Sequence, residues 1–192
     1  MRILAILVSS IALSATLSAA VAQAQAPTTP PPPEPDAAKA NPVTWSAMQI
    51  YSGREKNMLA AAEAMPADKY SYKPTDDQWT FGKIVSHIAG SNGTLCAAIG
   101  GAPAPDAVKV AETASKPELQ AALKASFDFC DKAMSSLTDA KLADTITFFR
   151  GAQLPRARAV IEITADLPDH YSQMAAYLRL NGILPPSAQP KK

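Results

Sequence analysis

Apolar residues recur at helical spacing in four segments of the chain, and polar or proline-rich breaks separate them. In the first two segments, 45–62 and 81–99, apolar positions follow one another at steps of three, four or seven residues. The third segment opens at Ser115-Lys-Pro-Glu118, the sequence of a capping box, and continues to Leu137. The fourth extends from Pro155 to Leu180. We predict four amphipathic helices.

The fourth helix should end at Asn181-Gly182, because an Asn-Gly pair followed by Pro185 and Pro186 is typical of a helix C-terminus. Four such segments with mostly short connections predict an all-α fold, a four-helix bundle over residues 43–184. The run Thr145–Phe149 has the composition of a short strand, but a lone strand has nothing to pair with.

The N-terminus has the pattern of a secretory signal peptide. One positive charge, Arg2, precedes an apolar run of about a dozen residues that ends at Ala22-Gln23-Ala24. Serines interrupt the run, so it falls short of the roughly 20 apolar residues that a transmembrane helix needs. We predict a signal peptide over residues 1–24, cleavage after Ala24, and a periplasmic or secreted protein with no stable membrane anchor.

Residues 25–42 are rich in proline, threonine and alanine, and we predict a disordered, extended linker there. Residues 185–192 should form a flexible tail. Residues 43–184 between them have the size of one ordinary domain. Without Arg2 the net charge is about zero and both signs are interspersed, so we expect no nucleic-acid partner. A small-molecule ligand and a homodimer both stay open as partners.

The only two histidines, His87 and His170, fall within the second and fourth predicted helices. At about 100° per residue, His87 lies at the edge of its apolar stripe, a position that faces a cleft. Asp166 precedes His170 by four residues, so the two side chains share a helix face and can reach one ion. Neutral imidazole is a common metal ligand, and His87, Asp166 and His170 form a candidate metal triad.

Pro168 leaves a second interpretation open. Inside a helix a proline removes one hydrogen bond and clashes with the carbonyl four residues earlier, so the fourth helix could kink or begin there. In that case Asp166 would be an N-cap and not a ligand. The two histidines would then be unrelated residues that cap, pack or face water.

Two motifs together resemble the DinB-like superfamily of four-helix metalloproteins. The first is Trp79-x-Phe-Gly-x-Ile-Val-x-His87-Ile-Ala, and the second is His170-Tyr-Ser-Gln-Met-x-x-Tyr-Leu-Arg-Leu-Asn-Gly-Ile-x-Pro-Pro186. The resemblance covers about residues 43–186. It implies a four-helix fold and a metal triad of one histidine on the second helix and a His-x-x-x-His pair on the fourth.

Carried over by position, that triad falls on His87, Asp166 and His170, so this chain has an aspartate where the family usually has a histidine. A carboxylate oxygen still binds zinc, nickel or manganese, the divalent metals we expect here. Tyr171 and Ser172 stand where relatives often have Arg-Gly, which changes the wall of the cleft. Gln173 and Tyr177 share a face with His170 and could support the triad.

Family resemblance implies either a thiol-dependent transferase or a metal-dependent hydrolase. Thiol cofactors are chiefly cytosolic, so an exported member fits a hydrolase that uses metal-activated water better. Glu162 and Asp169 are the candidate bases by position, although each is more commonly a solvated surface acid, and the catalytic residues stay unknown. A non-catalytic bundle that binds metal or a small ligand is the alternative. Covalent haem is excluded because no Cys-x-x-Cys-His occurs, and non-covalent haem held by His170 and a methionine is a remote alternative.

Cys96 and Cys130 are the only cysteines, an even count in a chain predicted to be exported. Cys130 lies on the apolar stripe of the third helix, and Cys96 lies about 80° from that of the second. Adjacent packing of the two helices could therefore join them in a disulfide. The alternative is a pair of buried thiols that act as small hydrophobes.

Overall fold

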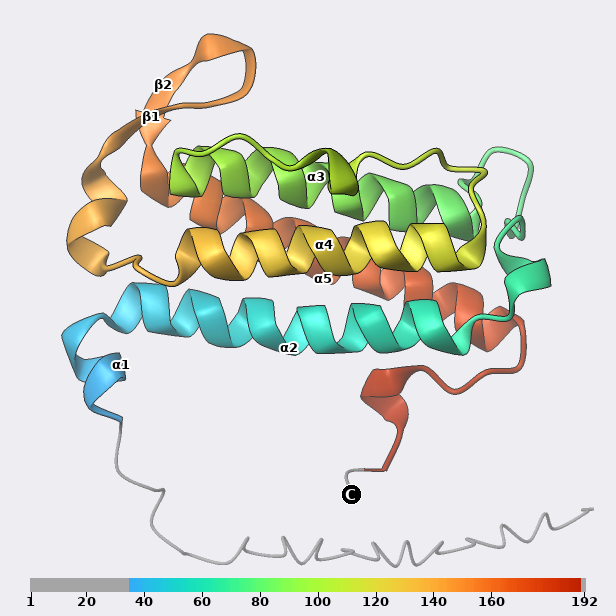
Figure 1. Cartoon of the computed structure of the whole chain (residues 1–192). Coiled ribbons are helices and arrows are strands. Elements are labelled where there is room, and N and C mark those ends of the chain that lie inside the picture. Colours follow the sequence, from blue (N-terminus) through green and yellow to red (C-terminus); the bar gives the residue numbers. More distant parts are fainter. Residues whose placement is uncertain (1–34, 191–192) are drawn as a thin grey trace, which may run out of the picture. The chain divides into compact units, whose positions relative to one another are not determined.

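The computed structural model describes residues 35–190, and four long helices account for most of them (Figure 1). These helices are α2 (Pro42–Ala64), α3 (Phe81–Gly100), α4 (Lys116–Met134) and α5 (Arg156–Leu180). The prediction of an all-α four-helix bundle is confirmed. Among the described residues, no helix has the length and apolar character needed to cross a membrane.

Two neighbouring helices of the bundle, α3 and α4, run in the same direction. Gly82, early in α3, lies against Leu119, early in α4, and Gly100 at the end of α3 lies against Ala133. The connection between them therefore returns along the outside of α3, where the Ser86 hydroxyl donates a hydrogen bond of 2.8 Å to the Val110 carbonyl. This connection covers one flank of α3 and does not cover the flank that packs against α5.

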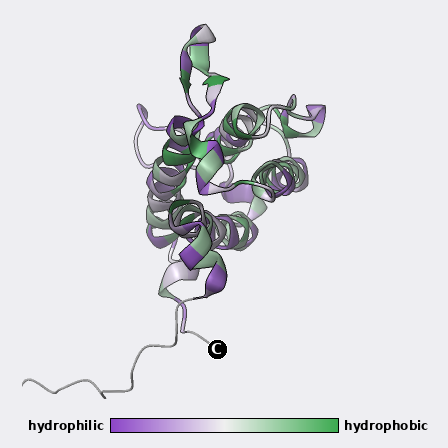
Figure 2. Cartoon of the chain, turned by 90° about the vertical axis from the view of Figure 1, so that its left-hand side faces the viewer, coloured by the Kyte–Doolittle hydropathy of each residue, from purple (hydrophilic) through white to green (hydrophobic). Residues whose placement is uncertain are grey.

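The apolar stripes of the four helices meet in one core. Figure 2 looks along the helices and shows that each carries both hydrophobic and hydrophilic residues. The largest fully buried side chains of the core come from all four, and they include Met58, Ile84, Ile88, Leu123, Phe127, Ile163 and Leu167. The predicted capping box at the start of α4 is also confirmed, with Ser115 and Glu118 bonded reciprocally. Helical periodicity in the sequence thus located both the core and a helix start.

A short helix, α1 (Asp36–Ala40), precedes α2, so the prediction of an extended linker is wrong for its last residues. Asp139 explains why the chain is ordered here, because its carboxylate accepts hydrogen bonds from the N–H groups of Val43 and Thr44 and so caps α2. The Asp139 N–H in turn donates to the Asn41 side chain. The rest of the predicted linker and the predicted signal peptide lie outside the described residues.

A small β-hairpin links α4 to α5, so the expectation of a strand without a partner is wrong. Strand β1 (Thr145–Thr147) pairs antiparallel with β2 (Gln153–Pro155), with Ile146 opposite Leu154. The sequence does not predict this partner, because β2 is three residues long and ends in a proline, both unusual for a strand. The hairpin projects from the bundle beside the C-terminal half of α3 (Figure 1).

The C-terminal segment is also ordered further than predicted. As expected, α5 ends at Asn181-Gly182, where Gly182 adopts a left-handed φ of 74° and the Ile183 N–H bonds back to Leu178. Residues 186–188 then form a short 3-10 helix, and the Ser187 N–H donates to the Tyr171 hydroxyl. The prediction of a flexible tail is therefore wrong for these residues.

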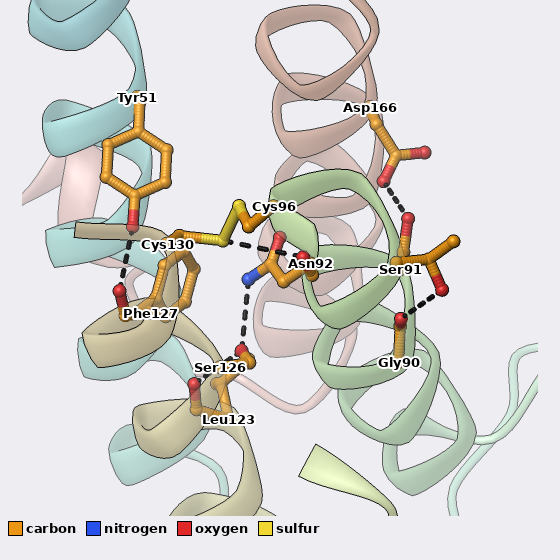
Figure 3. The surroundings of a disulfide bond; sticks show 11 residues. Tyr51, Gly90, Ser91, Asn92, Cys96, Leu123, Ser126, Phe127, Cys130 and Asp166 are labelled. Carbon is orange, nitrogen blue, oxygen red and sulfur yellow. Dashed lines mark hydrogen bonds between the residues drawn. A yellow bond between two sulfur atoms is a disulfide. The ribbon is translucent and has the colours of Figure 1, made fainter. Parts of the chain in front are cut away.

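Cys96 and Cys130 form a disulfide between α3 and α4, with Cα atoms 5.1 Å apart (Figure 3). One turn away, the fully buried amide of Asn92 donates to the Ser126 hydroxyl, which donates to the Leu123 carbonyl. These bonds engage the Asn92 side-chain NH₂ and both the donor and the acceptor of the Ser126 hydroxyl, whereas the buried Asn92 Oδ1 has no partner among the described residues. The α3–α4 contact is thus held by a covalent bond and a buried polar network.

Candidate metal centre

His87 lies on the flank of α3 that faces α5. Its helix neighbours Ile84, Val85 and Ile88 are fully buried, whereas His87 is exposed at the rim of the apolar stripe. The start of this helix is fixed by Thr80, whose side chain accepts a hydrogen bond from the Lys83 N–H. Helix geometry therefore places the His87 imidazole at the open edge of the α3–α5 contact.

Asp166 and His170 lie one turn apart in the middle of α5. The helix is continuous from Arg156 to Leu180 in spite of Pro168, so the alternative in which a helix begins at Pro168 and Asp166 caps it is wrong. Asp166 is therefore a mid-helix residue, and its side chain can contact His170, one turn further along the same helix. Its Oδ1 lies 3.4 Å from His170 Nε2.

The two helices bring His87, Asp166 and His170 together. One ligand atom from each residue lies within 4.8 Å of the other two, and the two imidazole centroids are 4.7 Å apart. Burial increases across the group, from the exposed His87 through the partly buried Asp166 to His170, which is only 6% exposed. Side chains far apart in sequence thus form one compact group that is open on the His87 side.

Trp79, just before α3, covers this group. Its ring is nearly parallel to that of His170, at an interplanar angle of 17° and a centroid distance of 6.4 Å, and lies 4.9 Å from that of His87. The Tyr177 hydroxyl donates a hydrogen bond of 2.9 Å to the Trp79 carbonyl and so fixes this segment. The sequence motif includes Trp79, but its contact with both imidazoles depends on the loop conformation, which periodicity does not predict.

Two further polar residues border the group. Ser91, one turn after His87, donates a hydrogen bond of 2.9 Å to Asp166 Oδ2 and holds that carboxylate in place (Figure 3). Gln173, expected to support a histidine, donates to Asp169 at 3.1 Å. Of the two candidate bases, Asp169 is thus paired with Gln173, and Glu162 forms an ion pair with Arg158.

The charges of the three residues influence one another. Burial opposes ionisation of Asp166, but hydrogen bonds from His170 and Ser91 outweigh it and hold the pKa of the carboxyl below its usual value. The bond to Asp166 raises the pKa of His170, whereas burial and the neighbouring His170 lower that of His87. The group thus combines an ionised carboxylate with two imidazoles of unequal basicity.

This donor set fits a small divalent cation. Two imidazole nitrogens and a carboxylate oxygen suit zinc, nickel or manganese, with bonds of roughly 2.0–2.2 Å for zinc. Ligand atoms on one such ion lie roughly 3–4 Å apart. The three ligand atoms here lie within 4.8 Å of one another, which is close to that spacing. His170 Nδ1 is also buried and has no hydrogen-bond partner among the described residues. A buried ring nitrogen without a partner is costly, so a hydrogen-bond partner at Nδ1 would stabilise the imidazole, while Nε2 is the nitrogen that faces Asp166.

The fold and the site together define the class of protein. It is a bundle of four long helices with a candidate metal group between two of them, formed by a histidine on α3 and an Asp-x-x-x-His pair on α5. The family model described as the DinB superfamily matches residues 49–174, and the chain belongs to this family. The resemblance seen in the sequence motifs is therefore confirmed.

Two solved structures share the fold. A DinB-like protein from Bacillus subtilis superposes with a TM-score of 0.60 at 21% identity, over 76% of this chain and 99% of that chain. A DinB-like protein from Bacillus cereus gives a TM-score of 0.59 at 17% identity, over 74% and 95% of the two chains. No curated protein matches the chain significantly. At these identities the structural similarity establishes the fold alone, so the chemistry has to be inferred from the residues of the site.

Proposed function

We propose that the chain is an exported metal-binding member of the DinB superfamily that acts as a metal-dependent hydrolase. The observation that carries the proposal is the convergence of His87, Asp166 and His170 within 4.8 Å. Asp166 would supply the charge that neutralises part of the cation, and the two histidines would supply neutral nitrogen ligands. A divalent cation held by these residues would lower the pKa of a water molecule and would so supply a nucleophile near neutral pH.

The residues around the group support this role. Ser91 orients the carboxylate, and orientation of a ligand by a hydrogen bond strengthens metal sites. Trp79 covers the group from one side, while His87 faces solvent, so a substrate would approach along the His87 side. The resemblance also implies a second reaction class, a thiol-dependent transferase. An exported protein works in an oxidising compartment, which favours water over a thiol as the nucleophile.

Metal analysis tests the site. The protein without its signal peptide is loaded separately with zinc, nickel and manganese, desalted and analysed for bound metal. We expect one ion per chain in the wild type and none in His87→Ala or His170→Ala. Glu162→Gln removes a carboxylate one turn from Asp166 on the same helix and should keep the metal. Retention of metal by either histidine variant, or no metal in the folded wild type, would contradict the proposal.

Turnover tests the reaction class. We expect ester or amide hydrolysis to rise with metal loading and to disappear in His170→Ala. Stoichiometric metal without turnover on ester and amide panels would reject the hydrolase and leave a non-catalytic metal-binding bundle. Turnover that requires an added thiol would favour the transferase.

Export is the third part of the proposal, supported by the signal-peptide pattern and by the Cys96–Cys130 disulfide, since disulfides persist in oxidising compartments. The full-length chain, expressed in a Gram-negative host, should appear in the periplasmic or secreted fraction with Gln25 as its first residue. A cytosolic chain that retains Met1 would contradict this.

A further inference from the structure

A pocket of about 690 Å³ lies between the β-hairpin and the C-terminal half of α3, away from the candidate metal centre. Thr94, Ala97 and Ala98 of α3 form one wall, and residues 146–150 of the hairpin form the other. Thr94 follows His87 by seven residues along the helix, which is about 10 Å. The pocket therefore requires its own ligand contacts and cannot share side chains with the metal group.

The walls of this pocket combine apolar surface with positive charge. Phe148 and Phe149 stand edge to face, with centroids 4.5 Å apart, and Phe149 is 49% exposed, although it is a large apolar side chain. Arg150 and Arg156 are the charged residues among the lining side chains, and no acidic residue of the described part of the chain lines the pocket. An occupant with an apolar body and a negative group would complement both features.

The two arginines differ in how far they are already engaged. Arg156 is largely buried, donates to the Ile99 carbonyl and lies 3.4 Å from an Asp144 oxygen, so its charge is partly neutralised within the protein. Arg150 is exposed, and no ion pair or side-chain hydrogen bond engages it among the described residues. Arg150 thus supplies the uncompensated charge at the pocket.

Arg150 is also the only residue other than glycine with a positive φ in the described part of the chain, at φ 57° and ψ 27°. The turn that holds it is closed by hydrogen bonds from the Phe148 N–H to Ala152 and from the Gly151 N–H to Phe148. A left-handed backbone is unfavourable for arginine, whereas glycine adopts it freely. An arginine at this position gives the hairpin a charged side chain that local stability alone does not explain.

We propose that this pocket binds a small organic anion, whose apolar body packs between Phe149 and α3 and whose negative group pairs with Arg150. This site goes beyond the proposed metal chemistry and does not depend on it. Salt should weaken the binding, because the Arg150 charge is exposed to solvent.

The test uses two fluorescent probes of similar shape, the anion 8-anilinonaphthalene-1-sulfonate and its neutral analogue N-phenyl-1-naphthylamine, titrated into the folded chain without its signal peptide. In Arg150→Gln we expect the affinity for the anion to fall about two- to fivefold, the range for an exposed charge pair, and that for the neutral probe to stay unchanged. Arg158→Gln, which removes an exposed arginine of α5 outside the pocket, should change neither affinity.

Phe149→Ser tests the apolar wall and should weaken the binding of both probes, whereas Ile161→Ser, at an exposed apolar residue of α5, should weaken the binding of neither.

Arg150→Gly separates charge from folding, because the variant should lose the preference for the anion while its melting temperature stays at or above that of the wild type. His87→Ala should bind both probes normally, so failure of the metal site leaves this site intact. Equal effects of Arg150→Gln and Arg158→Gln, or full anion affinity in Phe149→Ser, would overturn the proposal.

Discussion

The two flanks of α3 differ in how far they are closed to solvent, and the adjacent residues Ser91 and Asn92 mark the division (Figure 3). Toward α4, Asn92 is fully buried, bonded to Ser126 and one turn from a disulfide. Toward α5, Ser91 reaches a partly exposed Asp166 in a group that is open to solvent at His87. The closed flank toward α4 is thus buried and covalently tied, whereas the open flank toward α5 keeps ligand atoms within reach of solvent.

Removal of the disulfide should have the largest effect on the closed flank. Cys96→Ala combined with Cys130→Ala opens a loop with a sequence separation of 34 residues, which is worth about 3–4 kcal/mol in the loop-entropy model. Urea unfolding should show this loss, while metal affinity at the α5 flank stays near that of the wild type. A loss of metal binding in the folded variant would mean that the two flanks are coupled.

Asn92→Ala should have the next largest effect on stability. It removes the buried amide that bonds Ser126, and we expect the free energy of unfolding to fall by about 1–3 kcal/mol. Ser126→Ala is the partner variant, and a double-mutant cycle measures the coupling of the pair. Effects that add fully would show that the hydrogen bond contributes nothing beyond packing.

Asp166→Asn should reverse the pattern, with a small change in stability and a large change in metal binding. The carboxylate is only partly buried, so we expect unfolding to change by less than about 1 kcal/mol. Loss of a charged ligand should weaken metal binding more than about tenfold. Metal competition with a chromophoric chelator measures this, and Asp169→Asn on the same helix is the control.

Ser91→Ala should have the smallest effect. Its hydroxyl orients Asp166 and is not one of the three proposed ligands, so metal affinity should fall by about tenfold, the lower end of the range for a residue that orients a ligand. The Thr94 hydroxyl bonds to its own helix at the Gly90 carbonyl, so Thr94→Ala is a matched control on α3 that should leave the affinity unchanged. An equal loss in both variants would assign the effect to helix stability.

Periodicity and capping predicted the long helices because both depend on near neighbours in the sequence. The meeting of His87 with Asp166 and His170 was also expected, since it requires only that the two amphipathic helices pack side by side. Other features depend on contacts between distant segments. The ordered start of α2 requires Asp139, which is 95 residues away from Thr44, and no local pattern reports such a cap.

Short elements escaped prediction for a related reason. Helix α1 and strand β2 have five and three residues, too few to show a repeat, and each gains its order from a neighbouring element. Pro168 posed the opposite problem, because its local preference suggested a break that packing of α5 against α2 and α3 overrides. Local propensity was misleading wherever tertiary contacts decided the outcome.

The scarcity of imidazoles in this chain has a practical consequence for spectroscopy. Both histidines lie in the same group, so isotopic labelling of histidine alone would give two sets of ring signals, each reporting on that group without background. Addition of a diamagnetic cation such as zinc would show directly which ring nitrogen changes its chemical shift. Any affinity tag for such work should contain no histidine.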